Sequence, residues 1–336
     1  MLREAKKVNF KDILGQEPAL NKLQKDIKEE KFPGAYLFAG PDGVGKKMAA
    51  ICFAKALNCK KSKMGCNSCS SCIKMDKMVH PNLRIVAPQK SSIKIDQIRD
   101  LKKESSTKIY EGKKKVWIID EAEKLTQEAA NSLLKILEEP PPYLIIILVT
   151  STPRLLPSTV ISRCRILQFL PLSRENIERI LKDKKITEEN LIPLISCLSQ
   201  GSVSKALQIS QREEILRERE IILNLLKERK SLSAEIFKIS ERWSNQKNKT
   251  IDILLNMLLL FLRDIMMLKV GENENAIFNK DKKEEISKLK ETYSILHLCR
   301  AIKEVEKSRI LIQENISSQL VLEVMWIKIL YPEYAI

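Results

Sequence analysis

A glycine-rich segment at residues 40–47 has the spacing of a phosphate-binding loop. It reads GPDGVGKK and fits the pattern G-x-x-x-x-G-K up to its last position. The glycines that let backbone N–H groups converge on phosphate oxygens are Gly40, Gly43 and Gly45. Lys46 has the reach to contact the terminal phosphates. An apolar run at 35–39 precedes the loop and a helix is expected at 46–57, so the segment has the strand-loop-helix context of a nucleotide site.

The last position of this loop departs from the pattern. A loop that supports hydrolysis ends in Ser or Thr, whose hydroxyl coordinates Mg²⁺, whereas this loop ends in Lys47. An ammonium group cannot coordinate a cation and repels it. We therefore expect Mg²⁺ to bind poorly here and hydrolysis to be impaired, while ATP binding and slow hydrolysis stay open.

Four cysteines follow with the spacing C-x6-C-x2-C-x2-C. They are Cys59, Cys66, Cys69 and Cys72, half of the chain's eight cysteines. Four thiolates at such short spacings match a closed tetrahedral zinc site, in which every ligand comes from the protein. The alternative, unrelated surface cysteines, does not explain the clustering. The sequence therefore predicts a structural Zn²⁺ ion.

Two carboxylates follow a second apolar run. Residues 116–119 predict a strand buried on both faces, which delivers Asp120 and Glu121 to the sheet edge where α/β proteins bind ligands. In nucleotide hydrolases such a pair serves Mg²⁺ and the attacking water. The same carboxylates also suit the start of the helix expected at 122–138, so the residues alone leave both interpretations open.

Two further candidates lie downstream. A buried strand at 144–149 ends in Thr150, whose hydroxyl could sense a γ-phosphate or serve as an ordinary turn residue. Arg163 lies in the sequence Ser-Arg-Cys after a proline-containing loop. An arginine at a subunit edge can supply charge to a phosphoryl group in a neighbouring site, but by residue type alone Arg163 is a surface arginine.

Charge and hydropathy limit the class of protein. The 336 residues include 59 Lys+Arg and 43 Asp+Glu, a formal net charge of +16, which suits a nucleic-acid or acidic partner or simply a lysine-rich solvated surface. No apolar signal segment opens the sequence, and charges at Arg263 and Asp264 interrupt its most apolar helix. We therefore expect a cytoplasmic protein whose cysteines are not a disulfide framework.

Taken together, these segments resemble a known family. The segments that carry the resemblance are GPDGVGKK, CNSCSSC, IKIDQIRDL, WIIDEAEKLTQEAANSLLKILEEPP, LLPSTVISRC and GSVSKAL, within residues 10–207. They resemble the AAA+ clamp-loader subunits of bacterial DNA polymerase III, and within that family the delta-prime branch most closely. Weaker matches at 261–269 and 314–326 look like the family's collar helices.

The resemblance implies an α/β fold with a RecA-like parallel sheet and a zinc module, followed by a helical lid and an all-α collar. We place the nucleotide-binding domain at 1–170 with its zinc module at about 59–72, the lid at 171–210 and the collar at 211–336. The implied partners are tau/gamma and delta subunits in a hetero-oligomeric ring, the sliding clamp that the ring opens, and primer–template DNA.

The resemblance also implies roles for single residues. Arg163 would act in trans as an arginine finger on a neighbour's ATP site, and Glu121 would be a catalytic carboxylate of the chain's own site. The other nucleotide-binding residues would be the loop glycines, Lys46, Lys47, Asp120, Thr150 and Lys205. Lys205 stands where active subunits carry a second sensor arginine, and lysine lacks the planar fork that grips a phosphate at two points.

These assignments favour a delta-prime-like subunit that supplies an arginine finger and whose own ATP site is weak or inactive. Its enzymatic role would lie within the DNA-directed DNA polymerase (nucleotidyltransferase) holoenzyme, with at most residual ATPase activity of its own. Two alternatives remain. One is a hydrolysing tau/gamma-type ATPase, and the other is a zinc-dependent DNA-binding protein that uses the positive charge directly. Because an inactive site would not need Glu121, weak nucleotide binding and slow hydrolysis also stay open.

Overall fold

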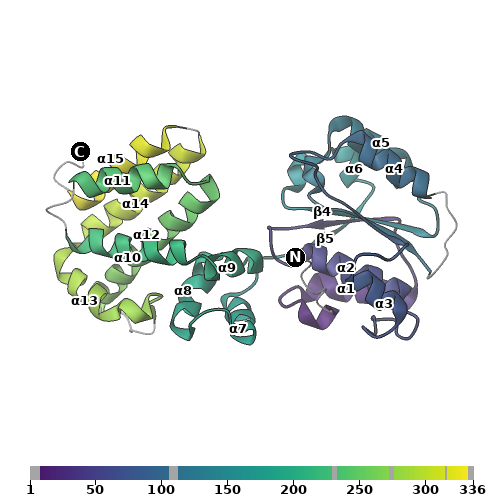
Figure 1. The fold of residues 1–336 in the computed structure, drawn as a ribbon, viewed down its shortest axis with the longest axis horizontal. Coiled ribbons are helices and arrows are strands. Elements are labelled where there is room, and N and C mark those ends of the chain that lie inside the picture. Colours follow the sequence, from purple (N-terminus) through teal and green to yellow (C-terminus); the bar gives the residue numbers. More distant parts are fainter. Residues whose placement is uncertain (1–7, 106–112, 229–232, 272–275, 315, 332–336) are drawn as a thin grey trace. The chain divides into compact units, whose positions relative to one another are not determined.

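The chain forms two compact units. The computed structural model describes residues 8–105, 113–228, 233–271, 276–314 and 316–331. One unit comprises residues 1–176 with 201–204, and the other comprises 177–200 with 205–336. The first contains the sheet and the second is helical (Figure 1). The first seven residues of the predicted nucleotide-binding domain lie outside the described ranges.

A five-stranded parallel sheet in the order β2-β3-β4-β1-β5 forms the centre of the first unit. Its strands are β1 (Ala35–Ala39), β2 (Leu83–Val86), β3 (Lys115–Ile119), β4 (Leu144–Thr150) and β5 (Arg165–Gln168). The three central strands are buried along their whole length, as expected for continuous apolar runs covered on both faces. The predicted parallel α/β fold is confirmed.

The strand register brings the candidate residues to one edge of the sheet. Within the three central strands, Ile119 pairs with Leu148 and Ala39 pairs with Thr150. The segments that follow β1, β3 and β4 therefore leave the sheet side by side at its carboxyl edge, where ligands bind in α/β folds.

Helices cover both faces of this sheet (Figure 1). One face carries α1 (Glu17–Glu29), α2 (Lys46–Asn58) and α3 (Ser70–Asp76), and the other carries α4 (Ile95–Ser105), α5 (Gln127–Glu138) and α6 (Ser158–Ile161). A buried cluster joins the sheet to the second group through Ile98, Leu133 and Val160. Short 3₁₀ turns occur at η1 (Phe10–Asp12), η2 (Ala122–Lys124) and η3 (Pro153–Leu155).

The helix expected at 122–138 begins later than predicted. Residues 122–124 form the 3₁₀ turn η2, and α5 starts only at Gln127. The hydroxyl of Thr126 caps α5 by accepting a hydrogen bond from the N–H of Ala129 at 3.3 Å, and Leu125 before it is extended. The sequence analysis did not anticipate β5 or α3.

The second unit consists of helices. They are α7 (Arg174–Lys184), α8 (Ile192–Leu198), α9 (Val203–Ser210), α10 (Glu213–Lys227), α11 (Ser233–Ser244), α12 (Asn248–Val270), α13 (Lys283–Thr292), α14 (Ile295–Gln313) and α15 (Ser318–Leu330), with 3₁₀ turns η4 (Glu189–Leu191) and η6 (Lys280–Lys282). The first residues of α7 and α9 belong to the other unit. The division into a lid at 171–210 and a collar at 211–336 stays a prediction.

Buried apolar faces hold these helices together. α14 packs against α12 and α15, and α11 packs against α15. On α15, Leu322, Met325 and Ile329 are buried, whereas Leu320 is exposed because it is two residues from Leu322 and two residues turn a helix by about 200°. None of the helices within the described ranges combines the length and the apolar character needed to cross a bilayer.

The charge that interrupts α12 is part of its packing. Asp264 is fully buried and accepts hydrogen bonds from the backbone N–H groups of Phe278 and Asn279 at 3.1 and 2.9 Å. The side-chain amide of Asn279 donates to the same carboxylate at 2.8 Å. Several donors satisfy this buried carboxylate, so Asp264 fixes Phe278 and Asn279 against α12.

Candidate functional site

The glycine-rich loop leaves β1 in a conformation that a side chain would not allow. A Cβ atom on Gly40 would lie 2.1 Å from the carbonyl oxygen of Phe169, and one on Gly43 would lie 2.4 Å from Oγ of Ser202. Both residues have positive φ angles, 152° and 75°. The two glycines therefore let the loop pass between the ends of neighbouring segments, which positions the start of α2.

Lys46 is buried at the start of α2. Its ammonium donates to the carbonyl oxygens of Gly40 and Pro41, each at 2.5 Å, and lies 4.0 Å from Asp42. Burial lowers the pKa of Lys46, and nearby carboxylates partly offset this effect. The ammonium thus binds carbonyls of its own loop, and it would have to leave them to contact a phosphate.

Lys47 forms an ion pair with Asp120. Its Nζ atom lies 2.9 Å from Oδ2 of Asp120, and the two side chains are 47% and 18% exposed. The register of β1, β4 and β3 explains the contact, because it brings the residue after β3 to the edge where α2 begins. The chain's own ammonium therefore occupies the position next to Asp120 that a coordinated cation would need.

Glu121 follows Asp120 in the turn after β3. Its backbone lies in the left-handed region with φ at 52°, and its half-exposed carboxylate pairs with the ammonium of Lys124. The pKa of Lys124 is raised by its hydrogen bond to Glu121. Glu121 would have to leave Lys124 to reach a water at the phosphate loop.

Glu123 is a carboxylate of this edge that the sequence analysis missed. Its Oε1 atom accepts hydrogen bonds from the hydroxyl and the N–H of Ser151 at 2.7 and 3.3 Å. Burial alone would raise the pKa of Glu123, but hydrogen bonds from Ser151 and Thr150 outweigh it and lower the pKa. Glu123 thus ties the turn after β3 to the end of β4, and its charge acts on Lys46.

Thr150 is buried at the end of β4. Its carbonyl accepts from the N–H of Gly40 at 3.3 Å, and its hydroxyl accepts from the N–H of Thr152 at 3.2 Å. The structure therefore brings the phosphate loop, Asp120 and Thr150 together. Lys205 belongs to the second unit, where its ammonium lies 3.6 Å from Asp252.

Arg163 makes contacts outside the loop. Its Nε and Nη2 atoms donate to one carboxylate oxygen of Glu138 at 3.0 and 2.6 Å, and Nη1 donates to the carbonyl of Thr159 at 2.8 Å. The side chain is 34% exposed. The guanidinium is therefore oriented by α5 and α6 while a third of its side chain remains accessible to solvent.

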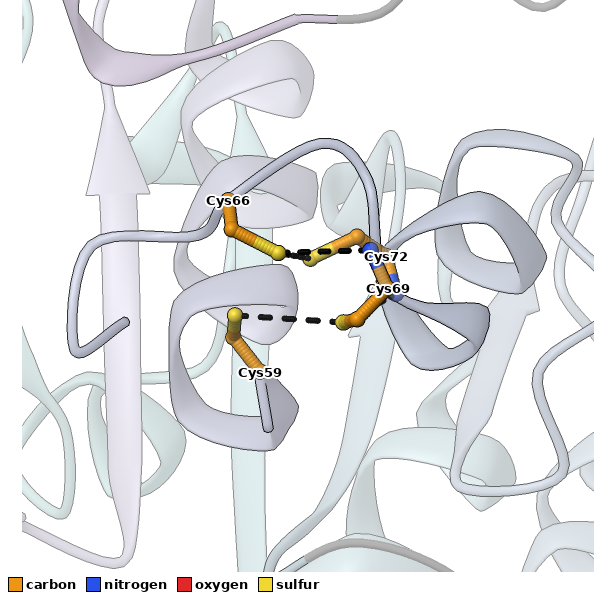
Figure 2. A group of neighbouring side chains, drawn as sticks. All are labelled: Cys59, Cys66, Cys69 and Cys72. Atoms are coloured by element: carbon orange, nitrogen blue, oxygen red, sulfur yellow. Dashed lines mark hydrogen bonds between the residues drawn. The ribbon is translucent and has the colours of Figure 1, made fainter. Parts of the chain in front are cut away.

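The four predicted cysteines come together between α2 and α3 (Figure 2). The sulfur atoms of Cys59 and Cys69 are 3.9 Å apart, as are those of Cys66 and Cys72, and all four lie within 4.8 Å of one another. Zn–S bonds of about 2.3 Å in a tetrahedron require sulfur separations of about 3.8 Å. The cluster therefore fits one metal ion with four protein ligands.

Several sulfur atoms of the cluster accept hydrogen bonds from backbone N–H groups. The N–H groups of Lys61 and Ser62 donate to Cys59 at 3.4 and 3.3 Å, and the N–H of Cys69 donates to Cys66 at 3.3 Å. Hydrogen bonds from Ser68 lower the pKa of Cys66 to about 5, whereas burial raises the pKa of Cys72. Because metals bind thiolates, these donors prepare the site for a cation.

A buried lysine supports the cysteine cluster. The ammonium of Lys55 on α2 lies 2.5 Å from Asp76 at the end of α3, and it donates to Oδ1 of Asn67 at 2.6 Å and to the carbonyl of Val8 at 2.7 Å. Lys55 is 1% exposed. Sequence reasoning missed it because lysines are rarely buried; its position within the apolar run Phe53–Leu57 was the available signal.

His80 is a buried histidine next to the cysteine module. It is 1% exposed, its Nδ1 atom accepts from the N–H of Asn82 at 3.1 Å, and its Nε2 atom lies 3.0 Å from the hydroxyl of Ser71. The hydroxyl of Ser71 donates to the carbonyl of Asn58 at 2.8 Å. His80 therefore links α3 to the start of β2.

Comparisons with known proteins give matches along most of the chain. Family models described as "DNA polymerase III, delta subunit" and "DNA polymerase III, delta subunit, C terminal" match residues 15–173 and 213–329. DNA polymerase III subunit delta′ of Bacillus subtilis is 34% identical over 278 residues, covering 81% of this chain and 83% of that protein. Subunit tau of the same organism is 34% identical over 208 residues, covering 60% of this chain and 37% of that protein. A solved gamma-subunit-related protein of Thermotoga maritima aligns with 93% of this chain and 98% of that chain, at 17% identity and a TM-score of 0.45.

Proposed function

Because this chain belongs to the delta-prime family of DNA polymerase III subunits, we propose that it works as a clamp-loader subunit that promotes ATP hydrolysis in a neighbouring subunit rather than in its own site. The subunit would join tau/gamma and delta subunits in a cytoplasmic ring that opens the sliding clamp and places it on primer–template DNA. Its domains would be the AAA+ domain at 1–170, the lid at 171–210 and the collar at 211–336.

The observation that carries the proposal for the chain's own site is the ion pair of Lys47 and Asp120. At 2.9 Å the ammonium neutralises the carboxylate that would bind Mg²⁺, and it replaces the hydroxyl that would be a second ligand. Phosphate groups can still approach the loop N–H groups and Lys46. The site would therefore bind a nucleotide weakly, with Thr150 as an additional contact, and would hydrolyse it slowly if at all.

Arg163 would serve the neighbouring ATP site. Its guanidinium is oriented by Glu138 and Thr159 and stays partly exposed, which suits a group that must reach another chain. A planar guanidinium can contact two phosphate oxygens at once and so stabilise the charge of the transition state. Its contacts with Glu138 and Thr159 do not involve the phosphate loop of its own chain. The presence of Lys47 in that loop would therefore not affect the position of Arg163.

Zn²⁺ would be held by Cys59, Cys66, Cys69 and Cys72. When bound it would supply a fixed crosslink between the end of α2 and the start of α3, and no open position for a substrate. The ion would therefore stabilise the module without taking part in hydrolysis. Lys55 supports the same junction from inside the protein.

Mutation of Arg163 in the reconstituted complex tests the proposal. Arg163→Ala should leave the chain folded. The ATPase rate of the complex should lose the contribution of the one ATP site that Arg163 serves, because an arginine finger accelerates hydrolysis there by about 10³- to 10⁵-fold. Arg163→Lys should not restore the rate, since lysine lacks the planar fork. Arg154→Ala, which removes an exposed arginine from η3, is the matched control. An unchanged rate with Arg163→Ala would remove the arginine-finger hypothesis.

A further inference from the structure

A lysine-lined pocket lies beside the cysteine cluster. It has a volume of about 360 Å³, and Cys59 is one of its lining residues. Five other lining residues are lysines, namely Lys60, Lys61, Lys63, Lys113 and Lys114. They come from two segments far apart in the sequence, the loop after α2 and the approach to β3. Within the described part of the chain this pocket therefore combines a concave shape with a high density of positive charge.

The end of α2 fixes both lysine segments. The sulfur of Cys59 accepts hydrogen bonds from the N–H groups of Lys61 and Ser62, which holds the first segment. The side-chain oxygen of Asn58 accepts from the N–H groups of Lys113 and Lys114 at 3.0 and 3.2 Å, which holds the second. Asn58, the last residue of α2, and Cys59, its cap, thus set the spacing of the lysines. This preorganisation lowers the entropy cost of binding a ligand.

The charge of the pocket is only partly balanced from within. Glu30 is its one acidic lining residue, and its carboxylate pairs with Lys63 at 3.1 Å. The hydrogen bond from Lys63 and the charges of Lys113 and Lys114 lower the pKa of Glu30. Five ammonium groups against one carboxylate leave a positive surplus, which favours an anionic ligand.

The remaining lining indicates what kind of anion fits. Ile27 and Leu57 give the pocket an apolar part, and the ring of Phe32 lies 5.4 Å from the ammonium of Lys114. Point charges suit phosphate oxygens, and an aromatic ring suits a base. The volume is in the range of small-ligand sites and too small for several residues of an extended acidic peptide.

We propose that this pocket binds a phosphate joined to a nucleobase, the unit shared by free nucleotides and nucleic-acid strands. Lys61 and Lys113 would contact phosphate oxygens from opposite segments, and Phe32 would contact the base. The site is separate from the phosphate loop and does not depend on the ATPase role proposed above. Its test uses the isolated full-length chain and DNA, so its failure would leave the arginine-finger result untouched.

The test measures binding of a fluorescein-labelled dT20 strand by anisotropy at several salt concentrations. Each phosphate contact with single-stranded DNA contributes about 0.7 to the slope of log affinity against log salt. The double variant Lys61→Gln/Lys113→Gln should therefore lower that slope by about 1.4 and weaken binding about 25-fold at 0.1 M salt. The control Lys303→Gln/Lys307→Gln removes the same charge from exposed positions of α14 and should retain most of the affinity.

A second variant, at Glu30, should strengthen the binding of dT20 instead of weakening it. Glu30→Gln removes the carboxylate of the pocket and should tighten binding, which a misfolded protein would not do. Competition by dTMP in the wild-type chain but not in the double variant would indicate a free nucleotide as ligand. Competition only by unlabelled dT20 would indicate a strand.

Two results would overturn the proposal. An equal loss of dT20 binding in the pocket variant and the α14 control would show that the net charge of the chain, and not the pocket, attracts DNA. Loss of binding to polyglutamate in the pocket variant, with dT20 binding unchanged, would assign the pocket to an acidic protein segment instead.

Discussion

Replacing Lys47 with threonine should restore a Mg²⁺ site at the phosphate loop. The change removes the ammonium that lies 2.9 Å from Asp120 and introduces the hydroxyl that the loop pattern calls for at this position. The pair is partly exposed, so its loss should change the free energy of unfolding by at most about 1 kcal/mol. Nucleotide binding and folding are therefore separable in this variant.

The structure sets a lower bound for the effect on Mg²⁺. An ion coordinated to Oδ2 of Asp120 at about 2.1 Å would lie within about 5 Å of the Lys47 ammonium, since both contact the same oxygen. Repulsion between a single and a double positive charge at about 5 Å costs about 1.7 kcal/mol even in bulk water. This corresponds to more than about tenfold in affinity, before the new hydroxyl ligand is counted.

The assay compares the affinity for a fluorescent ATP analogue in Mg²⁺ and in EDTA. In the wild-type chain Mg²⁺ should improve the affinity little, whereas in Lys47→Thr the improvement should exceed about tenfold. Lys47→Gln, which removes the charge without offering a hydroxyl at the same reach, should fall between them. Adding Asp120→Asn to Lys47→Thr should abolish the gain. The reasoning is refuted if the wild-type chain already gains as much from Mg²⁺ as Lys47→Thr does.

Three further outcomes follow from buried charges and from the cysteines. Lys55→Met leaves Asp76 buried without its cation and should cost about 3–5 kcal/mol in urea unfolding, while the double variant Lys55→Met/Asp76→Leu should recover most of that loss. Metal analysis of unoxidised protein should find one Zn²⁺ per chain, and a chelator should lower the melting temperature; a content well below one argues against the site. The pKa of Glu123 is lower in the folded state than its ordinary value of 4.5, so the ionised carboxylate stabilises the fold at pH values above 4.5. This stabilisation is lost as the pH falls through the lowered pKa of the folded state. Glu123→Gln should therefore flatten the acid side of the melting-temperature profile, and an unchanged profile would contradict the assignment.

The central strands and the cysteine cluster could be predicted because residues close together in the sequence determine them. The central strands are continuous apolar runs, and the cysteines of the metal cluster lie so close in the sequence that a short loop brings them together. β5 was missed because it is a short edge strand whose residues Arg165 and Ile166 are exposed, which leaves no periodic signal. The start of α5 was misplaced because the hydroxyl of Thr126 ends the preceding turn and begins a new helix.

Contacts between distant segments could not be read in the same way. The sequence identifies Lys47 as a departure from a pattern, but its contact with Asp120 depends on the order of β3, β4 and β1 in the sheet. The burial of Lys55 likewise depends on three partners, from the N-terminal segment, the cysteine loop and α3. The apolar neighbours of Lys55 are a local signal of its burial, but the partners that make burial of its charge tolerable lie in other segments.

Lys47 and Arg163 differ in a way that bears on the division of labour proposed for this subunit. Lys47 pairs with Asp120, the carboxylate that the chain's own site would need for Mg²⁺. Asp120 could therefore not coordinate Mg²⁺ while it is paired with Lys47. Arg163 pairs with Glu138, which lies at the end of α5 and has no place in the chain's own phosphate loop. Exchanging Glu138 for the phosphate of another chain would therefore cost only a partly exposed ion pair, worth at most about 1 kcal/mol, far less than an arginine finger contributes to hydrolysis. Under the proposed function, an ion pair would therefore block the chain's own site at Lys47 but leave Arg163 available to a neighbouring site.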